Sequence, residues 1–146
     1  MRLSKTFSIA FDLKPRATNP AVGAARAILK MQTSDKFCCN EGDNIPMVAF
    51  RGDKTTRIRV CMDMDKPNQC LYIKDTLPVN KFTSVLLKQE EKDGKSIFSI
   101  TIAGEEVEKK ENKKPREFNN VRIWASGRFR DAGNAEMRNL EIRNLG

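Results

Sequence analysis

The residues of this chain that are best suited to binding chemistry form a run of cations between Lys109 and Arg116. Five cations fall within eight residues: Lys109, Lys110, Lys113, Lys114 and Arg116. Clustered cations attract polyanions through their electric field and through release of the polyanion's counterions. The net charge of the whole chain, +8, also favours an anionic partner. We therefore expect these five residues to bind an anionic partner. The alternative is a solvated loop whose lysines only keep the protein soluble.

A second group of candidates surrounds the single tryptophan. Arg122 and Trp124 are two residues apart, so on a strand both side chains point to the same face. An arginine beside an exposed indole can pair with an acidic group while the ring stacks on a sugar or a base. Arg128 and Arg130 follow closely and complete the predicted ligand-binding set. The alternative is that Trp124 fills the core and Arg122 extends past it to solvent.

Four cysteines, Cys38, Cys39, Cys61 and Cys70, predict two disulfides and hence an oxidising compartment. Free buried thiols and a zinc site are the competing interpretations, but no Cys-x-x-Cys spacing and no histidine support zinc. Adjacent Cys38 and Cys39 do not readily bond each other, so we expect each to reach Cys61 or Cys70. A bridge between Cys61 and Cys70 is also conceivable, because they flank one connection and would close a hairpin.

The absence of histidine excludes the common catalytic arrangements that depend on it, such as a Ser-His-Asp triad. No nucleophile motif, cofactor motif or metal-ligand motif is present. We therefore predict a protein that is not an enzyme and needs no cofactor or metal. A carboxylate-based glycosidase is the enzymatic alternative, and it requires two facing acids that a sequence does not reveal.

The elements that would position these residues have the pattern of β-strands. In the stretch from Gly94 to Trp124, Phe98, Ile100 and Ile102 alternate with polar residues, which indicates a strand buried on one face. A turn at residues 103–106 follows, Val107 restarts the chain, and residues 108–117 read as a charged crossing. Val121 and Ile123 then alternate again.

Further strands are predicted along the rest of the chain, within residues 7–11, 25–31, 45–50, 56–64, 70–73, 82–89 and 135–145. Ile58, Val60 and Met62 share one face of their strand, with Arg57 and Arg59 on the other. The tripeptide Arg51-Gly52-Asp53 matches the integrin-binding sequence, but a hairpin tip favours Gly-Asp on its own. Residues 125–133 read as a long loop.

Many short strands separated by turn signals predict an all-β protein, an antiparallel β-sandwich of the jelly-roll type. At 146 residues we expect one domain, residues 1–146. No apolar run reaches the roughly 18 to 20 residues of a membrane helix. The first residues also lack the apolar segment of a signal peptide.

The last third of the chain has a pattern that is carried by Gly104, Pro115, Phe118, Val121, Ala125, Ser126, Arg138, Asn139 and Leu140. The order of these segments resembles the laminin-G-like and concanavalin-A-like jelly-roll modules of animal extracellular proteins, and galectins share the layout. The opening Phe-Ser-Ile-Ala-Phe-Asp-Leu-Lys-Pro is similar to the galectin opening strand. Galectins read galactose with a histidine that this chain lacks, and Trp124 stands outside the context of their stacking tryptophan.

The resemblance implies a secreted binding or adhesion module that recognises a glycan, sulfated or acidic, or an extracellular protein partner. An intracellular nucleic-acid-binding β domain is the alternative, supported only by the basic pI near 9.5. The aromatic and basic sheet motifs of RNA-binding folds are not visible, so nucleic acid is the less favoured partner.

Overall fold

The computed structural model describes residues 1–16, 27–36, 39–124 and 135–146, and these form ten β-strands. The strands are β1 (Phe7–Pro15), β2 (Ala27–Gln32), β3 (Met47–Phe50), β4 (Ile58–Met62), β5 (Gln69–Tyr72), β6 (Thr83–Lys92), β7 (Lys95–Ile102), β8 (Glu105–Glu111), β9 (Arg122–Trp124) and β10 (Ala135–Asn144). The described ranges contain no helix that could span a membrane.

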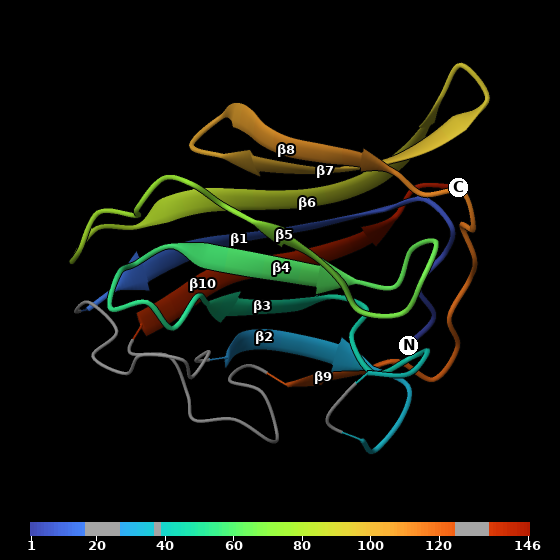
Figure 1. Ribbon diagram of the computed structural model, residues 1–146, viewed down its shortest axis with the longest axis horizontal. Coiled ribbons are helices and arrows are strands. Elements are labelled where there is room, and N and C mark those ends of the chain that lie inside the picture. Colours follow the sequence, from blue (N-terminus) through green and yellow to red (C-terminus); the bar gives the residue numbers. More distant parts are fainter. Residues whose placement is uncertain (17–26, 37–38, 125–134) are drawn as a thin grey trace.

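The strands form two five-stranded antiparallel sheets that pack as two layers (Figure 1). One sheet has the order β10-β1-β6-β7-β8, and the other has the order β5-β4-β3-β2-β9. Sequential neighbours pair locally, while β1 lies between β6 and β10. The prediction of an antiparallel all-β sandwich is thus confirmed.

The core lies between the sheets, and it is built by alternation on strands such as β1 and β6, while β2 and β3 are buried at every position. On β1, Phe7, Ile9 and Phe11 are buried while the residues between them are half-exposed. The facing sheet contributes Val48, Phe50, Ile58, Val60 and Met62 to the same cluster. Successive side chains of a strand point to opposite faces of its sheet, so one face of each sheet lines the core and the other face points away from it.

Two tight turns set the register of the strands that carry the predicted cations. Asp93 and Gly94 have φ of 52° and 76°, and Ala103 and Gly104 have φ of 53° and 83°. Two consecutive residues with positive φ are the geometry of a two-residue hairpin, whose twist matches that of the flanking strands. β6, β7 and β8 are therefore joined as a meander.

The predicted charged crossing begins later than expected. Lys109 and Lys110 are predicted to belong to it, but both lie on β8, opposite Ser99 and Phe98 of β7. An edge strand tolerates this density of charge because only one side of it is paired and charge discourages a further strand from adding. The connection that follows runs from Asn112 to Val121, and the reciprocal backbone bonds between Phe118 and Leu3 (2.8 and 2.9 Å) anchor it.

The disulfide pairing differs from the main expectation. Cys61 and Cys70 bond each other across the β4–β5 hairpin instead of each bonding Cys38 or Cys39. The reason is register, because the two residues are directly opposed in the ladder with their Cα atoms 4.0 Å apart. Cys39 is also disulfide-bonded, and Cys38 lies outside the described residues.

Candidate functional site

Two of the predicted cations line a hollow on the edge strand β8. Lys109 and Lys110 surround it together with Lys92, Ile97, Glu106 and Glu111, and its volume is about 330 Å³. Lys92 ends β6 and Ile97 lies on β7 opposite Glu111, so three neighbouring strands build the hollow. Sequence reasoning missed Lys92 and Ile97, although the Asp93-Gly94 turn signal brings their strands together.

The charge around this hollow is segregated along the chain. Over residues 105–117 five acids balance five bases, but three of the acids fall in residues 105–108. Residues 109–116 carry five cations and one acid, Glu111. The hydrogen bond to Glu90 (3.1 Å) raises the pKa of Lys92, and bonds from Lys88 and Lys92 lower the pKa of Glu90. The cations are therefore concentrated at the end of β8 and in the connection that follows it.

Lys113 and Lys114 continue this cationic end into the connection after β8. Both are exposed, and their backbone amides are held by side chains. The Lys113 N–H donates to Asp65 Oδ1 at 2.6 Å, and the Lys114 N–H donates to Asn112 Oδ1 at 2.9 Å. The backbone is thus fixed while the two ammonium groups extend into solvent. Within the described part of the chain, Lys109, Lys110, Lys113 and Lys114 form no ion pair.

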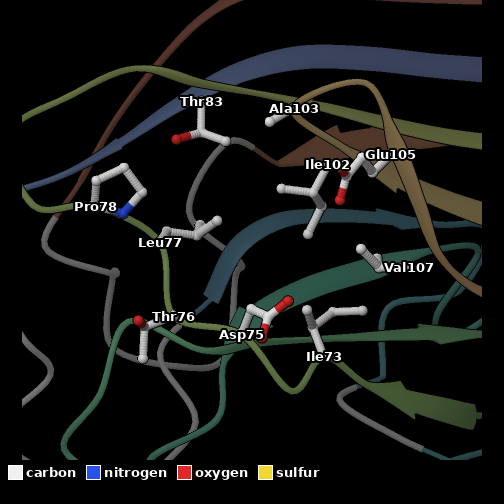
Figure 2. Close-up of a pocket in the computed structure, with 10 residues that line it drawn as sticks. All are labelled: Ile73, Asp75, Thr76, Leu77, Pro78, Thr83, Ile102, Ala103, Glu105 and Val107. Atoms are coloured by element: carbon white, nitrogen blue, oxygen red, sulfur yellow. The ribbon is translucent and has the colours of Figure 1, made fainter.

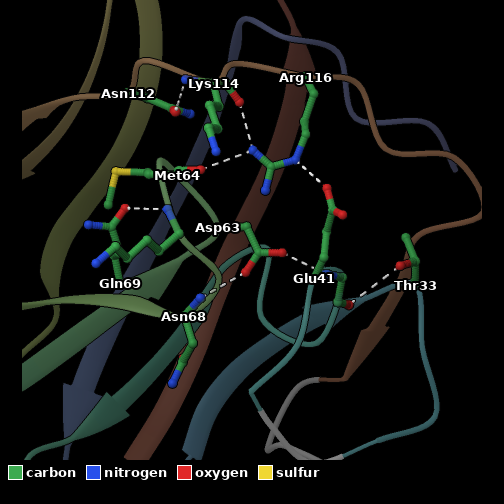
Figure 3. Close-up of polar contacts among 11 residues, drawn as sticks. Thr33, Glu41, Asp63, Met64, Asn68, Gln69, Asn112, Lys114 and Arg116 are labelled. Carbon is green, nitrogen blue, oxygen red and sulfur yellow. Dashed lines mark hydrogen bonds and ion pairs between the residues drawn. The ribbon is translucent and has the colours of Figure 1, made fainter.

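Arg116, the fifth cation of the run, is used inside the protein (Figure 3). Its Nε donates to Glu41 Oε1 at 2.6 Å, and its Nη1 donates to the carbonyl oxygens of Met64 (3.1 Å) and Lys114 (2.6 Å). Its guanidinium also lies 5.3 Å from the centre of the Phe118 ring. The side chain ties the β8–β9 connection to two loops of the other sheet, so we assign it a structural role.

Asp63 holds the same two loops from beneath (Figure 3). Its carboxylate accepts from the Gly42 N–H at 2.6 Å and from the Asn68 N–H at 3.0 Å. Burial raises the pKa of Asp63, against the lowering effect of these bonds and of nearby Arg116. This buried acid therefore holds in place the two loops that Arg116 contacts.

Arg122 and Trp124 lie far from the lysines. They share a face of β9, as predicted, opposite Gln32 and Lys30 of β2. β8 and β9 are edge strands of different sheets and lie on opposite sides of the molecule (Figure 1). Arg122 pairs with Asp35 at 2.8 Å. Trp124 is half-buried and belongs to neither the main core cluster nor the smaller cluster around Cys61. Arg128 and Arg130 lie outside the described residues.

A cleft of about 250 Å³ opens between the two sheets where β8 passes the segment after β5 (Figure 2). Its floor is apolar and includes Ile73, Ile102 and Val107. Two acids line it, Asp75 from the segment after β5 and Glu105 from β8, and both are exposed. In the described ranges, no three acidic or cysteine side chains converge as metal ligands would.

No protein-family model matches the sequence, and no curated protein sequence matches it either. Solved structures do match. The botulinum neurotoxin type G receptor-binding domain is similar with a TM-score of 0.64 at 16% identity, over 99% of this chain and 39% of that chain. A SAP-like pentraxin from Limulus polyphemus has a TM-score of 0.63 at 13% identity, over 97% of this chain and 67% of that chain.

The carbohydrate-binding module CBM66 from Bacillus subtilis has a TM-score of 0.52 at 17% identity, over 99% of this chain and 78% of that chain. Identities this low show a shared fold and leave ligands open. The first two similarities together with CBM66 confirm the architecture that the sequence resemblance implied. The chain folds as an antiparallel β-sandwich of the jelly-roll type.

Proposed function

We propose that this chain is a non-enzymatic, single-domain binding module that recognises an anionic glycan, a sulfated polysaccharide first of all. The contact surface is formed by Lys109, Lys110, Lys113 and Lys114, which we call the lysine surface. Arg122 and Trp124 lie too far from the lysine surface to contact the same sugar units. Arg116 is not included, because its side chain binds two loops of the protein itself. Binding is led by charge and is therefore weak at high salt.

One observation carries this proposal. Four ammonium groups from β8 and the following connection extend from a fixed backbone, and none is in an ion pair within the described residues. Unpaired, preorganised cations keep their full attraction for a polyanion because no internal partner has to be displaced. The hollow beside Lys109 and Lys110 adds an apolar contact at Ile97.

Two further observations support a glycan as the partner and an extracellular location. Among the proteins with a similar fold, CBM66 is a carbohydrate-binding module, and another, from Bacteroides ovatus, is a putative carbohydrate-binding protein. The Cys61–Cys70 disulfide favours an oxidising compartment. The proposal that the chain is a laminin-G-like module of an animal protein rests on the sequence resemblance. The other proposed partner is an extracellular protein, which would bind at the same lysine surface.

The test is a comparison of heparin with desulfated heparin at low and high salt. We expect binding only to the sulfated chain, with an affinity that falls as salt rises. The double variants Lys109→Gln/Lys110→Gln and Lys113→Gln/Lys114→Gln should each weaken it. The matched control is Lys36→Gln/Lys81→Gln, which removes the same charge from exposed positions off the lysine surface.

Equal weakening by the control pair would show that only net charge matters and would contradict a defined surface. Binding to desulfated heparin as strong as to heparin would contradict charge-led recognition. Tighter binding to single-stranded DNA than to heparin under the same conditions would favour the nucleic-acid alternative instead.

A further inference from the structure

A second cationic surface lies on the other sheet, on the face turned away from the core. It consists of Arg51, Arg57, Arg59 and Tyr72, and we call it the arginine–tyrosine patch. Arg59 lies on β4 and Tyr72 on β5, while Arg51 and Arg57 are the first and last residues of the β3–β4 connection. It shares no residue with the lysine surface, which belongs to the edge of the opposite sheet.

Strand register brings these four side chains together. Arg59 lies directly opposite Tyr72 on β5 and opposite Ala49 on β3. The Arg51 N–H donates to the Arg57 carbonyl oxygen at 2.9 Å, which extends the β3–β4 ladder by one more pair. Because Ile58 and Val60 point into the core, Arg57 and Arg59 must point outward. Directly opposed side chains on one face lie within contact distance.

Two guanidinium groups of the patch have hydrogen-bond donors that nothing in the described chain satisfies. The Nε atoms of Arg57 and Arg59 are both buried and without an acceptor. Arg59 also forms no ion pair with any described residue. Buried donors are nearly always paired in folded proteins, and an unpaired one costs free energy. Each Nε–H is itself covered, whereas the Arg57 side chain is 40% exposed overall, so an external acceptor would meet the outer nitrogens of these guanidinium groups.

Arg51 and Tyr72 supply a preformed wall beside these donors. The Arg51 guanidinium donates from Nη1 to the Ile73 carbonyl oxygen at 3.2 Å and lies 5.3 Å from the centre of the Tyr72 ring. The Tyr72 side chain nevertheless stays 48% exposed. An exposed aromatic ring held in place by a neighbour is a surface on which a sugar ring can stack.

One acid, Asp53, compensates the patch only in part. It lies 3.8 Å from both Arg51 Nε and Arg57 Nη1, beyond hydrogen-bond distance. Its short hydrogen bonds go to the hydroxyl and amide of Thr55, and the hydroxyl bond is the main reason that the pKa of Asp53 is lowered. Three arginines against one carboxylate leave a net charge of +2 by subtraction. The Arg-Gly-Asp tripeptide thus contributes Arg51 to this patch and places the Asp53 carboxylate beside it.

We propose that the arginine–tyrosine patch binds a single pyranose unit that carries a carboxylate or a sulfate. Arg59 and Arg57 donate to the anionic group, and the Tyr72 ring stacks on the sugar face. A guanidinium fork matches the geometry of carboxylate and sulfate oxygens, whereas a lysine offers only a point charge. This site goes beyond the proposed function, because it would give the module a specific sugar contact separate from the lysine surface.

The test uses nuclear magnetic resonance of the arginine Nε–H groups with three probes: glucuronic acid, glucose 6-sulfate and glucose. The Arg59 Nε–H resonance should shift on titration with at least one of the two acidic sugars and not with glucose. The two acidic probes distinguish a carboxylate ligand from a sulfate ligand. Arg59→Gln should weaken binding by about tenfold or more.

Three further variants separate this site from a general effect of charge. Arg59→Lys keeps the charge but loses the fork, so it should also bind more weakly than the wild type. Tyr72→Phe should bind normally and Tyr72→Ala weakly, because the ring and not the hydroxyl makes the contact. Lys109→Gln/Lys110→Gln should leave the titration unchanged, so failure here and failure of the lysine surface can be told apart.

The inference would be overturned by an Arg59 Nε–H that does not respond to either acidic sugar, or that responds equally to glucose. Unchanged affinity in a folded Arg59→Gln or Arg59→Lys protein, checked by its thermal melting, would overturn it as well.

Discussion

Cys61 and Cys70 lie directly opposite each other on β4 and β5 and are joined by a disulfide that closes a hairpin at the edge of a sheet. β5 is four residues long and pairs on one side only, with β4. A short edge strand with one partner has few interactions of its own. The disulfide therefore holds the strand that carries Tyr72.

Replacing both cysteines, as Cys61→Ala/Cys70→Ala, should lower the free energy of unfolding by about 2 to 3 kcal/mol, the loop-closure value for a separation of nine residues. Urea unfolding of the variant and the wild type measures this. Peptide mapping without reduction, after cleavage at Asp63 or Asp65, should find Cys61 linked to Cys70. A peptide that links either one to Cys38 or Cys39 would contradict the structure.

Asp63 should make stability depend on pH in an unusual direction. Its pKa is raised by burial, so the folded protein holds this proton more tightly than the unfolded chain does. The contribution of Asp63 to the free energy of unfolding then falls as pH rises above the unfolded pKa of about 3.9 and levels off above the folded pKa. Most paired carboxylates act in the opposite direction.

The measurement is urea unfolding of the wild type and Asp63→Asn across this range of pH. Asn keeps one oxygen acceptor, but its amide nitrogen cannot accept the second of the two bonds from Gly42 and Asn68. The variant is therefore less stable overall, and the informative quantity is the slope of stability against pH. The wild-type advantage over the variant should shrink as pH rises. An advantage that grows with pH would show that the two backbone bonds outweigh burial.

Trp124→Ala should destabilise the protein without affecting polyanion binding. The indole is half-buried outside the core, so the expected cost is about 1 to 3 kcal/mol, below the value for a fully buried tryptophan. Thermal melting and heparin affinity are measured on the same sample. Loss of heparin affinity at an unchanged melting temperature would instead place Trp124 in the binding surface.

The cleft between the sheets should not hydrolyse glycosides, although Asp75 and Glu105 both line it. Both acids are exposed at its rim, and no histidine is available as a partner. Release of nitrophenol from a panel of nitrophenyl glycosides should equal that of buffer. Turnover that disappears in Asp75→Asn or Glu105→Gln would contradict this and establish the glycosidase alternative.

The sequence is sufficient to predict the sandwich, because alternation such as Phe7, Ile9 and Phe11 reports directly which face of a strand is buried. The end of β8 escapes prediction, since only half-buried Val107 marks it as a strand and its lysines resemble a loop. Local pattern does not encode which residues of distant strands oppose each other.

The arginine–tyrosine patch depends on that register, whereas the Cys61–Cys70 disulfide closes a hairpin of consecutive strands and is open to prediction as the alternative pairing. Alternation already places Arg57 and Arg59 on the face away from the core, so part of the patch is visible in the sequence. Tyr72 and Arg51 join them only through the pairing of β5 and β3 with β4. The separation of Trp124 from the lysines likewise follows from which sheet each edge strand joins.

The central claim is that the lysine surface binds a sulfated polysaccharide, and a salt gradient on immobilised heparin tests it most directly. In the four-Gln variant, Lys109, Lys110, Lys113 and Lys114 are all changed to Gln. Its melting temperature should stay close to that of the wild type, because exposed substitutions usually change the free energy of unfolding by about 0.5 kcal/mol or less. It should elute at clearly lower salt than the wild type and the Lys36→Gln/Lys81→Gln control. Elution of the four-Gln variant at the wild-type salt concentration would contradict the account.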